Sequence, residues 1–464
     1  MLSVRNILEA TSGSLVSGVA CVFTGVSIDS RTIKKGELFI PVKGEKFDGH
    51  DFVAGVLETG AGAMVNMEWF NARKPLPGGK PVIAVPDTLL ALHDLARYIR
   101  TRLSCPVISV VGSNGKTTTK ELISSILSTR MKVLKTEGNL NNHIGMPLSI
   151  AGASGDIDVM VLEMGASRPG DIDTLCRIAM PDTGVITNIG MEHLEGFGSM
   201  EAVMKEEFTI LKYVGNVALN GDDEYMRSGM TPSYGGEAIY YGIDRDGDVM
   251  ASDIAMKDEG ASFLLSAGAG SVRVESKLSG RFNVYNSLAA AAVAHGMGFS
   301  LIEIKKGLEA FGGVKMRFEI RRHGGVTYMY DVYNANPSSM AASILELARL
   351  AGGCRSFAVL GDMLELGDFS AAAHEGIAGL LSEHKIRCFI GVGNFMSRAV
   401  SSFGGDGIRC ETPDDAGARL AGLVRPGDVV LIKGSRGMKM EKVMEVIECG
   451  VPGNNVLTNS ERRK

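Results

Sequence analysis

The chain has 464 residues, of which 45% are hydrophobic and 22% are charged, as is typical of a soluble globular protein of about three domains. The net charge of −5 provides no basic surface for nucleic acid, and no apolar run reaches the roughly 18 residues that a membrane span needs. The seven cysteines are scattered without a CxxC pair, and the first ten residues lack the pattern of a signal peptide. We therefore expect a cytoplasmic protein with reduced thiols that binds no nucleic acid and inserts into no membrane.

Residues 1–102 are predicted to form a small α/β domain. The stretch GVSIDSRTIKKGELFIPVKG (25–44) alternates strand-like runs with turn signals, and the segment after it is predicted to be a helix that runs into a strand. Asp87 is a good N-cap for the helix LLALHDLARYIR (89–100), which is expected to end near Arg102. Residues 103–106 are predicted to be a linker, because Pro106 blocks continuation of the helix.

Residues 103–312 alternate strand-like and helix-like runs, which predicts an open, doubly wound and mostly parallel sheet with helices on both faces. The strand-like runs after the first are 132–136, 158–165, 183–189 and 216–220, while residues 245–280 are predicted to be an antiparallel excursion. Ligands of such sheets bind beyond the carboxyl ends of the strands. This places residues 112–117, Glu163 and residues 188–193 on one rim.

The first strand of this domain leads into a glycine-rich turn. The apolar run 107–111 is followed by GSNGKTT (112–118) and then by a helix-like pattern. Glycines let backbone N–H groups turn inward, and a helix start adds unpaired N–H groups, so this turn is predicted to cradle the phosphates of a nucleoside triphosphate. Lys116 can reach the β- and γ-phosphates, and the Thr117 hydroxyl can bind Mg²⁺. The alternative is a turn with a solvated lysine, because Val110 stands where the general motif has its first glycine. The residues predicted to bind the nucleotide here are Gly112, Ser113, Asn114, Gly115, Lys116, Thr117 and Thr118.

Residues 313–464 are predicted to form a second doubly wound, Rossmann-like α/β domain. Strand-like runs at 329–334, 357–363, 388–393 and 428–434 alternate with helices such as 338–351 and 415–424. The strand ends, at Asn334, Asp362, Gly393 and Lys433, are expected to face the nucleotide rim across a cleft.

Four further residues are candidates for chemistry, each with a plainer alternative. Glu163 ends an apolar strand and is predicted to hold Mg²⁺, although it could be a helix-capping acid. His193 lies in a glycine-rich loop, where a lone histidine is more often a surface group. Asn286 opens an alanine-rich helix and is better explained as a helix cap than as an adenine contact. Arg317 can close onto a phosphate or form a linker salt bridge.

A nucleotide site of this kind leaves two classes of protein open. One is an enzyme that sends the γ-phosphate to a substrate, and the other is a nucleotide-switched regulator. The polar cluster that begins at Asp331 and the sequence KGSR (433–436), which can clamp an anion, both follow strand ends on the same cleft. Convergence of polar strand ends favours the enzyme, and no DE run follows an apolar strand as a switch would more often require.

An ordered set of motifs resembles the Mur ligase family along essentially the whole chain. The phosphate loop is shared by all relatives, including folylpolyglutamate synthases, whereas GNLNN, DVYNANP and GDMLELG are typical of the member that adds a dipeptide. Members that add a single amino acid carry D-x-A-H-x-P where this chain has residues 331–337. The motifs that carry the resemblance are GSNGKTT (112–118), GNLNNHIGMP (138–147), VLEMGA (161–166), HLEGFGS (193–199), Asn286, MRFE (316–319), DVYNANP (331–337), GDMLELG (361–367) and KGSR (433–436).

The resemblance implies an ATP-dependent amide ligase that adds D-alanyl-D-alanine to a UDP-N-acetylmuramoyl-tripeptide in cytoplasmic peptidoglycan precursor synthesis. ATP would phosphorylate the tripeptide carboxylate, and the dipeptide amine would then attack the acyl phosphate. The cofactors implied are ATP and Mg²⁺, with the nucleotide between the second and third domains of what we expect to be a monomer. The alternatives are another Mur-type ligase, such as an amino-acid-adding enzyme or a folylpolyglutamate synthase, or a regulatory P-loop NTPase.

The resemblance also implies roles for individual residues. Lys116 would cradle the γ-phosphate, Thr117 and Glu163 would hold one Mg²⁺, and His193 would hold a second. The implied nucleotide contacts are Asn286, Arg317 and Asp331. The implied UDP-sugar site comprises Ser27, Asp29, Ser30, Arg31, Lys43, Gly44, Phe47 and Asp48, and the implied peptide sites comprise Asn139, Asn142, Asn334, Asn336, Asp362, Glu365, Lys433 and Arg436.

Two positions depart from the family pattern. The family usually has a carbamoylated lysine in the helix after HLEGFGS, but spacing places Glu207 there and Lys205 two residues earlier. Residues two apart on a helix point about 200° away from each other, so only one of them can face a metal. Our hypothesis is that Glu207 serves catalysis as an unmodified metal ligand, with Lys205 as the alternative. His143 stands where close relatives often have Asp, which leaves its role open.

Overall fold

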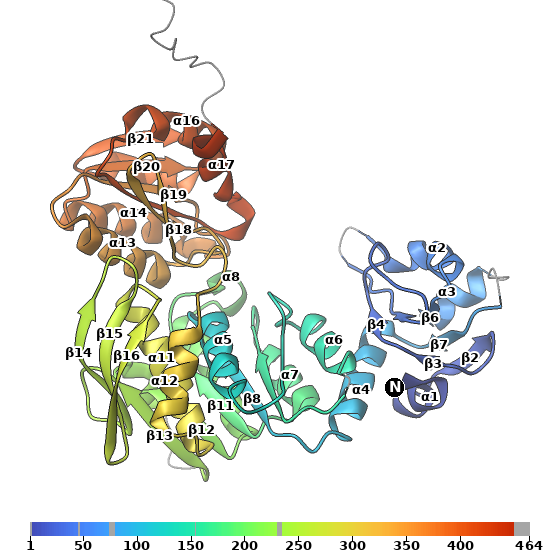
Figure 1. Cartoon of the computed structure of the whole chain (residues 1–464). Coiled ribbons are helices and arrows are strands. Elements are labelled where there is room, and N and C mark those ends of the chain that lie inside the picture. Colours follow the sequence, from blue (N-terminus) through green and yellow to red (C-terminus); the bar gives the residue numbers. More distant parts are fainter. Residues whose placement is uncertain (1, 45–46, 74–78, 154, 230–233, 450–464) are drawn as a thin grey trace, which may run out of the picture.

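The computed structural model describes residues 2–44, 47–73, 79–153, 155–229 and 234–449. These residues form three α/β units in chain order, each built around its own main sheet (Figure 1). This arrangement confirms the predicted three-domain α/β fold. No helix in these ranges is long and apolar enough to cross a membrane. Residues 45 and 46, which interrupt the predicted UDP-sugar loop, lie outside the described residues.

The N-terminal domain is built on a five-stranded sheet. Strands β4 to β7 pair in parallel, and β2 pairs antiparallel with β7 at one edge. Because β4 and β5 are parallel neighbours, the loops that follow them leave the same edge of the sheet. In sheet order the strands are β2 (Ser14–Ser17), β7 (Val82–Val85), β6 (Gly62–Asn66), β5 (Leu38–Phe39) and β4 (Val26–Ser27), beside a pair formed by β1 (Leu2–Ser3) and β3 (Val22–Phe23). The helices are α1 (Val4–Thr11), α2 (Val53–Glu58), α3 (Met67–Ala72) and α4 (Thr88–Arg100), with a 3-10 turn η1 (Gly49–Phe52).

The central domain contains a nine-stranded sheet. Strands β8 to β13 pair in parallel, and β14 continues the parallel run before β15 and β16 add an antiparallel edge. The antiparallel excursion predicted for residues 245–280 is therefore present, but its first strand, β14, also pairs in parallel with β13. In sheet order the strands are β16 (Gly270–Ser276), β15 (Ala261–Ala267), β14 (Val249–Met256), β13 (Glu237–Gly242), β12 (Asn216–Asn220), β11 (Thr183–Ile186), β8 (Val107–Val111), β10 (Val159–Glu163) and β9 (Val133–Lys135).

Helices cover both faces of this sheet because its central strands are apolar on both sides. Val107 and Val111 of β8 pack into one core cluster, and Ile108 and Val110 pack into another, as the two-residue period of a strand requires. Burial on both faces is typical of an interior strand, and β8 lies between β11 and β10 with its carboxyl end at the rim. The helices are α5 (Lys116–Leu127), α6 (Gly145–Ala151), α7 (Asp171–Ala179), α8 (Leu194–Phe197), α9 (Met200–Glu207), η2 (Phe208–Lys212), α10 (Glu224–Gly229), α11 (Arg281–Gly296) and α12 (Leu301–Ala310).

The C-terminal domain is a six-stranded sheet that is parallel except for the edge strand β17. It lies beside the central domain, while the N-terminal domain stands apart and is joined through α4 (Figure 1). In sheet order the strands are β17 (Glu319–His323), β18 (Val326–Asp331), β22 (Val429–Lys433), β19 (Ser356–Gly361), β20 (Cys388–Val392) and β21 (Asp406–Cys410). The helices are α13 (Pro337–Ala351), α14 (Ser370–Glu383), α15 (Phe395–Ala399), α16 (Pro413–Leu423) and α17 (Glu441–Cys449), with 3-10 turns η3 (Gly367–Phe369), η4 (Val400–Ser402) and η5 (Arg436–Met438).

Helix α4 belongs to two cores at once. Leu92 packs into the core of the N-terminal domain, whereas Ala96 packs into the core of the central domain. The buried Arg100 donates from Nε to the carbonyl of Ala179, 2.8 Å away in the central domain. The joint between the two domains therefore includes α4 as well as the predicted linker 103–106.

Candidate active site

The turn after β8 has the backbone that its glycines predict. Gly112 has a φ of 117° and Gly115 a φ of 80°, in a region that favours glycine. A Cβ on Gly112 would lie 2.3 Å from Oγ1 of Thr187, and one on Gly115 would lie 2.3 Å from Oδ1 of Asn286. Helix α5 begins at Lys116, directly after this turn, so its unpaired N–H groups open onto the loop. The geometry is that of a phosphate cradle.

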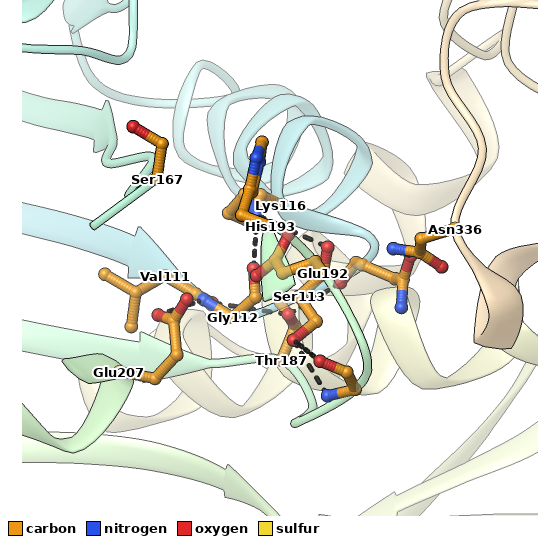
Figure 2. Close-up of polar contacts among 12 residues, drawn as sticks. Val111, Gly112, Ser113, Lys116, Ser167, Thr187, Glu192, His193, Glu207 and Asn336 are labelled. Atoms are coloured by element: carbon orange, nitrogen blue, oxygen red, sulfur yellow. Dashed lines mark hydrogen bonds and ion pairs between the residues drawn. The ribbon is translucent and has the colours of Figure 1, made fainter. Parts of the chain in front are cut away.

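The Lys116 side chain folds back over the turn (Figure 2). Its Nζ donates to the carbonyls of Gly112 and Ser113 and lies 3.3 Å from Oε2 of Glu192. Burial lowers the pKa of Lys116, but the carboxylates around it, foremost Glu192, outweigh burial and raise the pKa above its usual value. The lysine is therefore a cation held at the loop.

Glu207 reaches the turn from its other side (Figure 2). Its Oε2 accepts a 2.7 Å hydrogen bond from the backbone N–H of Gly112, and only 2% of the residue is exposed. Burial, and then the carboxylate of Glu192, raise the pKa of Glu207 well above its usual range. Neither Glu207 nor the exposed Lys205 is among the described residues that line the cleft.

Glu163, at the carboxyl end of β10, has one carboxylate oxygen bonded and one open. Oε1 accepts a 2.8 Å hydrogen bond from Nδ2 of Asn141, and the backbone N–H of Glu163 donates to Oγ1 of Thr136. Oε2 is buried and has no hydrogen-bond partner among the described residues. A buried carboxylate oxygen without a donor, in the same cleft as the Thr117 hydroxyl, fits a divalent cation.

The protein alone supplies few ligands for such a cation. Among the described residues, no group of three or more His, Cys, Asp or Glu side chains is gathered in a way that could hold a metal. Mg²⁺ is usually bound by one or two carboxylates together with substrate phosphates and waters. The donor set at Glu163 and Thr117 therefore fits Mg²⁺ that arrives with a nucleotide.

His193 connects the central domain to the C-terminal domain. Its Nδ1 lies 2.5 Å from Oε2 of Glu365, and the backbone N–H of Glu195 donates to the carbonyl of Glu365. The hydrogen bond that His193 donates to Glu365 raises the pKa of His193 although burial opposes it, and the same bond lowers the pKa of Glu365. Both residues have a positive φ, 46° for His193 and 63° for Glu365, which is unusual away from glycine.

A second polar contact between the domains begins in the glycine turn. The Asn114 side chain accepts from Nδ2 of Asn336 and donates to Oγ of Ser338, both at 2.9 Å (Figure 2 shows Asn336). Oδ1 of Asn336 also accepts from the N–H of Ser339 and thereby caps α13. The Asn114 side chain thus spans the cleft, and its backbone N–H is bonded to Oδ1 of Asn188.

The linker between the central and C-terminal domains carries Arg317. Its guanidinium stacks over the Tyr333 ring at 4.0 Å, and its Nε is buried without a hydrogen-bond partner in the described part of the chain. Its neighbours Met316 and Phe318 both have a positive φ, so the linker backbone is held in a strained form. A stacked guanidinium with an open N–H is suited to an anion.

Asn286 lies inside α11 and is not its cap. The helix begins at Arg281 with Gly280 as N-cap, so the predicted capping role of Asn286 was wrong. The amide is buried, and it bonds to Asn283 and to Thr119 of α5. Sequence reasoning misplaced the helix start because the alanine run begins later than the helix itself.

Asp331 and Lys433 end two neighbouring parallel strands, β18 and β22, and form a buried ion pair. Nζ of Lys433 lies 2.5 Å from Oδ2 of Asp331, with 3% and 14% of the two side chains exposed. Oδ2 also accepts from Oγ of Ser343, and Oδ1 accepts from the N–H of Phe318. The pair therefore ties the domain linker to the end of the C-terminal sheet.

These residues share one cleft of about 810 Å³ between the central and C-terminal domains. The predicted site residues that line it are Ser113, Asn114, Gly115, Lys116, Thr117, Thr118, Asn139, Asn142, Glu163, His193, Asn286, Arg317, Asp331, Asn334, Asn336, Glu365, Lys433 and Arg436. His143, whose role the sequence left open, lines it as well. A cleft across two strand rims was predicted, and the structure brings Glu163 of one sheet and Asn334 and Lys433 of the other together there, but Gly393 is not among the described residues that line it.

Asp362, which was predicted to serve the peptide substrates, has its carboxylate engaged by the backbone of its own domain. Its buried carboxylate accepts hydrogen bonds from the backbone N–H groups of Asn394, Phe395 and Met396, and so caps the N-terminus of α15. It is not among the described residues that line the cleft. A carboxylate occupied by three backbone donors serves the local fold.

The residues predicted to bind the UDP-sugar lie on the N-terminal domain, away from this cleft. Ser27 is the last residue of β4, Asp29, Ser30 and Arg31 follow it, and Lys43, Gly44, Phe47 and Asp48 belong to the loop after β5. Asp29 accepts from Arg31 at 2.7 Å, and Lys43 pairs with Asp48 in an isolated bridge. The two loops leave the same edge of the sheet, and Phe47 is 76% exposed.

Sequence reasoning missed three residues around the phosphate turn. Glu192 pairs with Lys116, Asn141 holds Glu163, and Lys120 is a fully buried cation behind Glu163. Asn141 stands inside the recognised motif GNLNN, and Glu192 directly precedes the motif HLEGFGS, so their position was the available signal. Nothing in the sequence marked Lys120 as buried, because a lysine in a helix is usually solvated.

A P-loop facing a Rossmann-like domain across one cleft defines a nucleotide-using enzyme that works between two domains. Three family models match in this chain: the "Mur ligase family, catalytic domain" over residues 22–100, the "Mur ligase middle domain" over 110–294 and the "Mur ligase, glutamate ligase domain" over 316–436. The chain belongs to the Mur ligase family.

Individual relatives match along nearly the whole chain. The UDP-N-acetylmuramoyl-tripeptide–D-alanyl-D-alanine ligase of Bacillus subtilis (strain 168) is 36% identical over 96% of this chain and 97% of its own length. The enzyme of the same name from Escherichia coli (strain K12) is 33% identical over 96% and 98%. A crystal structure of MurF from Acinetobacter baumannii aligns with a TM-score of 0.87 at 30% identity, covering 97% of this chain and 99% of that one. MurF from Thermotoga maritima, in complex with ADP, aligns with a TM-score of 0.80 at 31% identity over 92% and 97%.

Proposed function

We propose that this protein is an ATP-dependent ligase that adds D-alanyl-D-alanine to a UDP-N-acetylmuramoyl-tripeptide in cytoplasmic peptidoglycan precursor synthesis. The observation that carries the proposal is the single cleft in which the phosphate turn, the open oxygen of Glu163 and the polar strand ends of the C-terminal domain meet. Full-length similarity to relatives that bear the name of this reaction supports it.

The chemistry needs both sides of such a cleft. A carboxylate is a poor electrophile, because its two oxygens share the negative charge. One carboxylate oxygen of the tripeptide attacks the γ-phosphorus of ATP, ADP leaves, and an acyl phosphate forms. The dipeptide amine then attacks the acyl carbon, loses a proton, and expels inorganic phosphate from the tetrahedral intermediate to leave an amide. Closure of the two domains keeps water from the acyl phosphate.

We assign the nucleotide to the central side of the cleft. The N–H groups at the start of α5 and the cation of Lys116 receive the phosphates, and Thr117 and Glu163 are the residues that would hold Mg²⁺, with His193 as a candidate for a second ion. When bound, Mg²⁺ offsets the repulsion between the ATP phosphates and the incoming carboxylate. Asn286, Arg317 and Asp331 are assigned to the remainder of the nucleotide.

The substrates are assigned to the outer parts of the molecule. We place the UDP-sugar at the two loops that leave one edge of the N-terminal sheet, with the exposed Phe47 and Arg31 available to it. The peptide substrates are placed at the polar side chains of the cleft that the nucleotide does not use, namely Asn139, Asn142, Asn334, Asn336, Glu365, Lys433 and Arg436. We also propose that the enzyme acts as a monomer.

The experiment follows the oxygen of the tripeptide carboxylate. With ¹⁸O in that carboxylate, one labelled oxygen is expected in the released phosphate, and ADP release is expected to require both the UDP-muramoyl peptide and D-alanyl-D-alanine. Absence of label in the phosphate would exclude acyl-phosphate chemistry. ADP release that ignores both substrates would indicate a regulatory NTPase, and dependence on a single amino acid instead of the dipeptide would indicate another Mur-type ligase.

A further inference from the structure

A lysine with no exposed surface, Lys120, lies next to the carboxylate of Glu163, the candidate metal ligand. Lys120 is on α5, one helical turn after Lys116, and its residue exposure is 0%. Its Nζ lies 3.9 Å from Oε2 of Glu163, which is close enough for a charge interaction and too long for a hydrogen bond. The positive charge therefore faces Glu163 and leaves the lone pairs of Oε2 open.

Other bonds hold the ammonium group at this distance. Nζ donates to the carbonyl of Thr136 and lies 3.0 Å from Oε1 of Glu121. Oε2 of Glu121 is in turn held by Lys135 at 2.6 Å, and Oγ1 of Thr136 accepts from the backbone N–H of Glu163. Lys120 is thus fixed by groups other than Glu163, so its separation from Oε2 is built into the fold.

A fixed cation at this place has two effects on Glu163. It balances a carboxylate that is 2% exposed, which would otherwise be a costly unpaired charge in the protein interior. It also repels any second cation that approaches Oε2, because weak screening makes charge interactions strong in a buried site. The protein alone gathers no group of three acidic, histidine or cysteine ligands within the described ranges, so a lone metal ion finds little to offset that repulsion.

We propose that Lys120 makes metal binding at Glu163 conditional on the nucleotide. Lys120 cancels the charge of Glu163, so that a divalent cation binds only when the phosphates of ATP bring further negative charge and oxygen ligands. This inference rests on the metal site of the proposed function and adds a residue that neither touches the substrate nor binds the metal. Its consequence is that Mg²⁺ enters together with ATP.

The test measures metal binding without nucleotide and without turnover. Mn²⁺ is titrated into the full-length protein and followed by electron paramagnetic resonance, for wild type, Lys120→Met and Lys135→Met. Removal of the buried charge in Lys120→Met is expected to tighten binding of free Mn²⁺ by about tenfold or more. Lys135→Met is the matched control: Lys135 shares the partner Glu121, but its side chain is 30% exposed, and it is expected to behave as wild type. Lys120→Arg, which keeps the charge, is expected to bind free Mn²⁺ as weakly as wild type.

The outcomes separate this inference from the proposed metal site. If folded Lys120→Met binds free Mn²⁺ no more tightly than wild type, the role of Lys120 is wrong. If Lys120→Met does not fold, the double variant Lys120→Met/Glu121→Gln removes the carboxylate left unpaired and carries the same expectation. Wild type with ADP must bind Mn²⁺ for the site itself to stand; if it does not, the metal site fails whatever Lys120 does.

Discussion

Removal of the Lys433 charge tests whether the ion pair with Asp331 supports the C-terminal side of the cleft. In Lys433→Met a side chain that is 3% exposed keeps its length and loses its charge, which leaves Asp331, with 14% of its side chain exposed, without its cation. Loss of one partner of a buried pair costs about 3–5 kcal/mol. Asp331 keeps its hydrogen bonds from Ser343 and Phe318, so we expect the free energy of unfolding of the C-terminal domain to fall by an amount near the lower end of this range, about 3 kcal/mol.

The assay must report on the C-terminal domain alone. The single tryptophan, Trp69, lies in the N-terminal domain, so its fluorescence is expected to follow that domain and to stay unchanged in the variant. Hydrogen exchange of the amides in β18 and β22 reports the free energy of opening where the pair is. Isothermal titration with ADP shows whether nucleotide binding weakens at the same time.

A double-mutant cycle isolates the pair itself. Asp331→Asn/Lys433→Met is expected to recover about 2 kcal/mol relative to the sum of the single variants, because neither charge is then left unpaired. Lys442→Met is the matched control: Lys442 and Asp414 form an ion pair in the same domain, but 45% and 56% of their side chains are exposed, so a change of at most about 0.5 kcal/mol is expected. A loss below about 1 kcal/mol in Lys433→Met, or no coupling in the cycle, would refute the reasoning.

Three further predictions concern the phosphate turn and the domain contact. Burial raises the pKa of Glu207, so between the usual glutamate pKa and the raised one the native protein holds a proton that the unfolded chain has released. The free energy of unfolding therefore falls as the pH rises through this range. Glu207→Gln is expected to remove this fall, as measured by denaturant unfolding at a series of pH values. Gly115→Ala would place a Cβ 2.3 Å from Asn286 at a φ of 80°, and nucleotide affinity is expected to fall by about tenfold or more in a calorimetric titration. The hydrogen bond to Glu365 raises the pKa of His193, so the ion pair between them is present below the raised pKa and is lost as the pH rises through it. Glu365→Gln is therefore expected to separate the central and C-terminal domains at about pH 6 and to have little effect at about pH 9, as measured by small-angle scattering.

Each of these has a control or an outcome that contradicts it. A stability gain of Glu207→Gln that is the same at every pH would show that the carboxyl group of Glu207 titrates normally. Gly376→Ala, on α14 with nothing within 4 Å of the added Cβ, is expected to bind nucleotide as wild type does. An effect of Glu365→Gln that is equal at both pH values would mean that the contact with His193 does not depend on its charge.

Much of the fold follows from local sequence patterns. The apolar run 107–111 forms the buried parallel strand β8, and Asp87 caps α4 through a 2.9 Å hydrogen bond from the N–H of Leu90, as predicted. Of the strand ends that were predicted to face one another, Glu163, Asn334 and Lys433 line one cleft, whereas Asp362 and Gly393 are not among the described residues that line it. These features depend on residue period, capping chemistry and the parallel direction of βα units, all of which are properties of short segments.

Residue identity alone did not determine what a polar side chain does. Asp362 and Asp331 both stand at strand ends, but the first caps α15 and the second pairs with Lys433 in the cleft. Glu207 and Lys205 could not be separated by sequence; the structure buries Glu207 against Gly112 and exposes Lys205. Which donors and charges surround a carboxylate depends on elements far apart in the chain.

The sequence by itself determined the three α/β units, the phosphate turn and the family, because these are encoded in contiguous motifs. Only the tertiary structure decided that α4 joins two cores, that Glu163 keeps one oxygen open, and that Lys120 stands behind it without exposure. The physical reason is that burial and electrostatic environment arise from the packing of distant segments, and they decide whether a charged side chain is solvated, paired or ready for a ligand.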